Sequence, residues 1–247
     1  MTPKLISRRN LQLAAVLLSA AAAKLYYSAA SVNQLRWILA PTTLLVELLS
    51  GSRFEFESHA GYMSGDRSFV IAASCAGVNF LITSFLTLAL GKLWRDRRVD
   101  TAWRFIPCAA LLAYLSTILA NTIRISTALG LHSMPRELGW LSPGQLHRLE
   151  GIFIYFGFLL LTFTLGEKMG SDRASASEHT PGLFRRTFCP LLFYYATTLG
   201  VPVANGAYRQ GAAFWEHALF VLLAPLALIL PLATLRFYRE QQVKRAA

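Results

Sequence analysis

Repeated apolar runs, each close to 20 residues long, constrain this chain more than any other feature. An α-helix rises 1.5 Å per residue, so about 20 residues cross the roughly 30 Å hydrocarbon core of a bilayer. A soluble domain of 247 residues, 54% of them hydrophobic, would struggle to bury so many runs. We therefore expect an all-α polytopic membrane protein, a bundle of about six to seven transmembrane helices. The long runs cover residues 11–30, 76–94, 103–124, 149–166, 187–203 and 214–235.

The net charge of +11 comes from Lys and Arg residues that cluster between the apolar runs. A nucleic-acid-binding protein gathers such charge on one face, whereas cytoplasmic loops of membrane proteins are enriched in Lys and Arg. We therefore expect membrane lipid around the chain and no nucleic-acid partner. The same rule assigns the loop with Arg95, Arg97 and Arg98, the polar segment 167–186 and the basic C-terminal tail to the cytoplasm.

The first 50 residues leave the number of spans open. Run 11–30 follows Arg8 and Arg9 and contains Lys24 without a clean cleavage site, which favours a retained anchor over a signal peptide. Run 37–49 is short and holds Pro41 and Glu47. If it crossed the membrane, the basic N-terminus would lie outside, against the charge rule. We favour a half-inserted element and a cytoplasmic N-terminus.

Residues 53–74 differ from their surroundings. Phe54 and Phe56 alternate with Glu55 and Glu57, and a turn-rich stretch precedes the β-prone run 69–71. This pattern predicts a small β-hairpin outside the bilayer. We expect a single integral membrane domain, 1–247, made of an N-terminal anchor with a short apolar element (1–50), a core (51–168), a cytoplasmic loop (169–186) and a C-terminal helix pair with a basic tail (187–247).

Counting the spans from the Arg-rich loop places three residues at the same membrane face: Cys75, Arg124 and His147. Their side chains are the ones that cysteine acyl transfer requires. The partial positive charge of a helix N-terminus favours a thiolate at Cys75. Arg124 could pair with a developing oxyanion, and Asn121 lies three residues earlier on the same helical face. His147 carries the side chain that exchanges protons near neutral pH. Taken singly, each also fits packing or contact with lipid headgroups.

The neighbours of these residues resemble three motifs of the exosortase and archaeosortase family of membrane transpeptidases. The matching runs are Ser-Cys-Ala-Gly-Val-Asn-Phe at 74–80, Asn-Thr-Ile-Arg at 121–124 and His-Arg-Leu-Glu-Gly at 147–151. The similarity extends over roughly residues 35–166 and is greatest to the K-type exosortases. Many family members have Ser where this chain has Ala76; both residues are small.

The resemblance implies a cysteine transpeptidase with Cys75 as nucleophile, Arg124 as oxyanion stabiliser, His147 as general acid and base, and no cofactor or metal. From its helical spacing, Asn121 is a supporting residue that could orient the Arg124 guanidinium or donate its own amide hydrogen bond. The substrates would be secreted proteins with a C-terminal signal of short motif, hydrophobic helix and basic cluster, and an unidentified nucleophile would accept the product. The enzyme would lie in the bacterial cytoplasmic membrane with its active site outside.

Other classes of protein need other residues. The chain has neither the GxSxG elbow of a serine hydrolase nor the HExxH helix of a metalloprotease. A transporter or an assembly scaffold stays the alternative. A transporter predicts ionisable residues near mid-membrane and repeated halves, and a scaffold makes no chemical demand on Cys75.

Overall fold

The computed structural model describes residues 8–95, 99–132, 143–169 and 183–246. Within this part of the chain, six helices are long and apolar enough to cross a membrane, as in an integral membrane protein. This confirms the prediction of a helical, polytopic chain. Contacts divide the chain into two compact units, residues 1–137 with 162–171, and residues 138–161 with 172–247.

The first unit is built on three long helices, α1 (Arg8–Ala29), α3 (Val78–Arg95) and α4 (Val99–His132). Val16 of α1 packs against Leu93 of α3 and Ala109 of α4, so the basic start of α1 lies at the same end as Arg95. At the opposite end, Ala20 belongs to a cluster with Val78 and residues late in α4. The helices therefore alternate in direction, as the span count requires.

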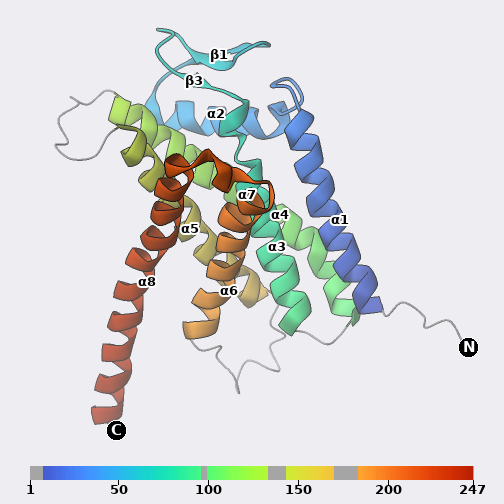
Figure 1. Ribbon diagram of the computed structural model, residues 1–247, viewed down its shortest axis with the longest axis vertical. Coiled ribbons are helices and arrows are strands. Elements are labelled where there is room, and N and C mark those ends of the chain that lie inside the picture. The colour runs from blue at the N-terminus through green and yellow to red at the C-terminus, as the bar shows by residue number, and fades with distance from the viewer. Residues whose placement is uncertain (1–7, 96–98, 133–142, 170–182, 247) are drawn as a thin grey trace, which may run out of the picture. The chain divides into compact units, whose positions relative to one another are not determined.

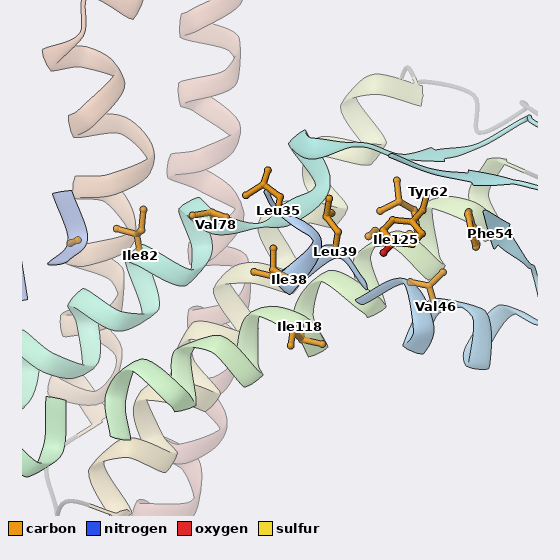
Figure 2. Packing of buried hydrophobic residues seen from close by; sticks show 13 residues of the cluster. Leu35, Ile38, Leu39, Val46, Phe54, Tyr62, Val78, Ile82, Ile118 and Ile125 are labelled. Atoms are coloured by element: carbon orange, nitrogen blue, oxygen red, sulfur yellow. The ribbon is translucent and has the colours of Figure 1, made fainter. Parts of the chain in front are cut away.

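The short apolar run forms helix α2 (Arg36–Ser50), which lies across the end of this helix group in Figure 1. Its 15 residues reach about 22 Å, less than a bilayer core. Among the described helices α2 is not a candidate span, which reduces the expected count from six or seven to six. Its buried residues Ile38, Leu39 and Val46 pack on α3, α4 and the sheet, as Figure 2 shows.

The segment after α2 forms a three-stranded antiparallel sheet in the order β1 (Phe54–Glu57), β2 (Gly61–Ser64), β3 (Val70–Ile71). The predicted hairpin is present as β1 and β2, and the β-prone run 69–71 supplies the short third strand; the position of the sheet outside the bilayer stays a prediction. Phe54, Tyr62 and Ile71 are buried in the same cluster as α2. The guanidinium of Arg36 lies 4.5 Å from the Phe56 ring centroid. The sheet is thus fixed on α2, and β3 continues into the turn that carries Cys75 (Figure 1).

The second unit contains the start of α5 (Pro143–Met169), α6 (Leu183–Tyr195), a π-helical turn η3 (Ala196–Gly200), α7 (Val201–Ala204), η4 (Ala207–Gln210) and α8 (Ala212–Ala246). The Phe156 and Tyr194 rings meet edge to face at 5.4 Å. The Tyr195 hydroxyl donates to the Leu222 carbonyl oxygen at 2.7 Å. These contacts join α5, α6 and α8 into one packed group.

Several expectations concern loops outside the described residues. They are the Arg97 and Arg98 part of the cytoplasmic loop, most of the connecting segment 130–145, which the span count places outside, and most of the cytoplasmic segment 167–186. The assignment of these loops to one or the other membrane side stays a prediction.

Candidate functional site

Cys75 lies in a tight turn between the sheet and α3. The turn is the 3-10 helix η1 (Ala73–Ala76), in which the Cys75 amide donates to the Ala72 carbonyl oxygen at 2.9 Å. Gly77 ends it in a left-handed conformation, φ 67°, and α3 begins at the next residue. The half-buried Cys75 therefore directly precedes a helix N-terminus, where the helix dipole favours an anion.

Asn121 of α4 fastens this turn. Its Nδ2 donates to the Cys75 carbonyl oxygen at 2.6 Å, and the side chain is completely buried. The contact depends on Gly77, because a Cβ atom added there would lie 2.5 Å from Asn121 Nδ2. Glycine supplies both the positive φ and the space for the amide. We expected Asn121 either to orient the Arg124 guanidinium or to donate its own amide hydrogen bond, and the hydrogen bond described here goes to the backbone of Cys75.

Arg124 follows Asn121 by three residues on the half-buried part of α4. Three residues advance a helix by about 4.5 Å and return to nearly the same face. Arg124 is thus one turn beyond the residue that holds Cys75. We expected the span to end at Arg124, but α4 continues to His132, so the guanidinium lies on regular helix within the candidate span and not at its end.

A second cation lies near the turn, on α1. Lys24 Nζ donates to the Asn79 side-chain oxygen at 2.8 Å, in the first turn of α3, and lies 5.7 Å from the Tyr27 ring centroid. The Tyr27 hydroxyl is 3.5 Å from the Ala73 carbonyl oxygen. The turn around Cys75 therefore has α1 on one side and Asn121 on another.

His147 belongs to the second unit, in the first turns of α5. Its Nδ1 lies 3.3 Å from Glu150 Oε2; the histidine side chain is 48% exposed and that of Glu150 only 8%. A carboxyl group on Nδ1 fixes the orientation of the ring and leaves Nε2 for proton transfer. The i,i+3 spacing of these residues was the sequence signal for this pair.

The neighbours of His147 are joined to α8. Gln145 Nε2 donates to Glu216 Oε1 at 3.1 Å, and Arg148 Nη1 lies 3.7 Å from the same oxygen. Glu216 therefore contacts residues on both sides of His147, a role that no motif in the sequence predicted. Its only sequence signal was an acidic residue at the start of an apolar run.

The predicted site residues are divided between the two units. Cys75 and Asn121 are in direct contact, with Arg124 on the same helix, and His147 is placed in its own unit with Glu150. Among the described residues, no group of three or more His, Cys, Asp and Glu side chains could hold a metal ion. Comparison of the chain with protein-family models, with curated proteins and with solved structures gives no match.

Proposed function

We propose that this protein is a membrane-embedded cysteine transpeptidase of the exosortase type. It cleaves the C-terminal sorting signal of secreted proteins through a thioester on Cys75 and transfers them to an acceptor nucleophile. The observation that carries the proposal is the hydrogen bond from Asn121 to the Cys75 carbonyl oxygen. It holds the backbone of this cysteine just before the N-terminus of α3, and Asn121 itself lies one helical turn from Arg124 on α4.

The alternation of spans supports the assignment of His147 to the same membrane face. Cys75 precedes α3, Arg124 lies in the later part of α4, and His147 lies at the start of α5. If each of these helices crosses the bilayer, all three positions reach the side opposite the Arg-rich loop. That side is the outer face, where a secreted substrate is available.

In the proposed reaction, Cys75 first attacks and later leaves, and His147 first donates and later accepts a proton. The Cys75 thiolate attacks the scissile carbonyl carbon, and the resulting oxyanion pairs with the Arg124 guanidinium. The C–N bond then breaks, and the His147 imidazolium gives its proton to the leaving amine. An acceptor amine, hydroxyl or water loses a proton to the neutral His147, attacks the thioester and releases the Cys75 thiolate. Glu150 orients the imidazole throughout.

The transporter alternative finds weaker support in the first unit. Its buried ionisable residues Lys92 and Glu167 line one small cavity, and Lys92 Nζ lies 5.7 Å from the Phe105 ring centroid. These residues lie within one turn of the Arg95 end of α3 and near the end of α5. A transport path would require such groups near mid-membrane.

The test is the processing of a tailed reporter, a secreted domain fused to a C-terminal tail of short motif, apolar helix and basic cluster from the same genome. Cys75→Ala, Arg124→Ala and His147→Ala should each abolish the shortening of the reporter. Cys108→Ala, Cys189→Ala and His59→Ala are the matched controls. Cys108 lies in the first half of α4, away from Asn121 and Arg124, Cys189 lies in α6, and His59 lies in the turn between β1 and β2. Processing by Cys75→Ala, or no processing by the wild-type protein, would refute the proposal.

A further inference from the structure

Strand β3 is an edge strand whose outward hydrogen-bonding groups belong to Val70. The Ser64 amide donates to the Phe69 carbonyl oxygen at 2.9 Å, so Ser64 and Phe69 form a hydrogen-bonded pair. The next pair in the register is Met63 with Val70. Hydrogen-bonded and non-bonded pairs alternate in an antiparallel ladder, so the N–H and C=O of Val70 point away from β2. Val70 is 37% exposed.

At the opposite edge of the sheet, strand β1 has an outward N–H group that is hydrogen-bonded to a side chain. Gly65 donates to the Arg53 carbonyl oxygen at 3.2 Å, which makes Phe54 a residue whose N–H points outward from β1. Glu47 of α2 accepts a hydrogen bond from this N–H at 2.7 Å. Proteins commonly cover edge strands because exposed N–H and C=O groups pair with other chains. Here a side chain of α2 accepts from the outward N–H of Phe54 on the β1 edge, and the outward groups of β3 lead toward Cys75.

We infer that the outer edge of β3 binds the sorting motif of the substrate as an added, extended β-strand. The inference rests on the proposed function. Its occupant is the polypeptide segment around the scissile bond, because the extended backbone of β3 continues through Ala72, φ −85° and ψ 175°, directly into the turn of Cys75. A segment paired with Val70 is thus delivered along the strand to the nucleophile.

This mode of binding recognises the substrate through hydrogen bonds to its backbone. The Val70 N–H donates to a substrate carbonyl oxygen, and the Val70 carbonyl oxygen accepts from a substrate N–H. Alternate substrate side chains then face opposite sides of the extended sheet. The pairing orders the motif near Cys75 and leaves the choice of side chains to residues on the two faces.

The first test compares Val70→Pro with Val70→Ala in the full-length protein acting on the tailed reporter. Both lose the valine side chain, but only proline removes the outward N–H, and no bond to β2 is lost. We expect KM to be about fivefold higher in Val70→Pro than in Val70→Ala, the effect of one hydrogen bond of about 1 kcal/mol. Equal KM values for the two variants would overturn the inference.

The second test does not depend on proline. In a Cys75→Ala, Cys108→Ala, Cys189→Ala background, Val70→Cys is oxidised in the presence of reporters that carry a single cysteine at successive motif positions. A paired strand predicts disulfide formation at every second position. Cross-links at no position, or without this period, would overturn the inference while wild-type processing of the reporter keeps the proposed function intact. No processing by the wild-type protein would overturn both.

Discussion

Gly77 is the position where a single methyl group should do most damage to the candidate site. An alanine at a left-handed φ of 67° costs about 1 to 2 kcal/mol. The new Cβ would also lie 2.5 Å from Asn121 Nδ2, so the buried amide must move from the Cys75 carbonyl oxygen. Disturbing a buried hydrogen-bonding group costs about 1 to 3 kcal/mol. We expect Gly77→Ala to lower the free energy of unfolding by about 2 to 5 kcal/mol and to reduce reporter processing.

Gly51 provides the matched control for the backbone term. Its φ is 71°, and a Cβ added there meets no atom within 4 Å, so Gly51→Ala isolates the cost of the left-handed conformation. Unfolding by SDS titration in mixed micelles should give Gly77→Ala a larger loss than Gly51→Ala, by about 1 to 3 kcal/mol. In an Asn121→Ala background, this difference should disappear. Equal losses for the two glycine variants, or strict additivity with Asn121→Ala, would refute the reasoning.

Three further predictions concern the sheet and the membrane face. Glu47→Ala should lower the free energy of unfolding by about 1 to 3 kcal/mol, because the Phe54 N–H loses its acceptor. Glu47→Gln keeps an acceptor and should cost less in the same SDS titration. Equal losses for the two variants would contradict the assignment of the Phe54 N–H to the outer edge of β1. The hydroxyl of Ser64, then that of Ser68, lowers the pKa of Asp66 to about 2. The stabilising contribution of this carboxylate is therefore complete above the reference pKa of about 3.9 and is lost as the pH falls through about 2. An NMR titration of Asp66 with a midpoint near 3.9 would contradict this prediction. A membrane-impermeant maleimide added to intact cells should label Cys75 and leave Cys108 unmodified, since Cys108 lies in the α4 half nearer the Arg-rich loop; the reverse pattern would invert the proposed topology.

The sequence predicted the features that depend on composition and local period. The apolar runs predicted the membrane helices because span length and hydropathy are properties of a single segment. Alternation of Phe54, Glu55, Phe56 and Glu57 predicted a strand for the same reason. Cys75, Asn121 and His147 were each identified as candidates from the residues of their own segments.

The contacts that shape the site could not be predicted in this way. The hydrogen bond from Asn121 to Cys75 joins residues 46 positions apart, and the fit of Gly77 against Asn121 depends on helix packing. The continuation of α4 past Arg124 was missed because the hydropathy pattern ends with the charge, whereas the helix does not. The role of Glu47 as acceptor for Phe54 follows from the way the sheet lies on α2, which no local pattern encodes.

The central claim is that Cys75 forms a thioester with the cleaved substrate, and intact-mass analysis of the trapped adduct tests it most directly. Reporter and full-length protein are incubated briefly, denatured in acid and measured with and without hydroxylamine. The account predicts an added mass equal to the N-terminal cleavage fragment, located on Cys75, removed by hydroxylamine, and missing from Cys75→Ala but present in Cys108→Ala. Shortened reporter without any such adduct, or an adduct that persists in Cys75→Ala, would contradict it.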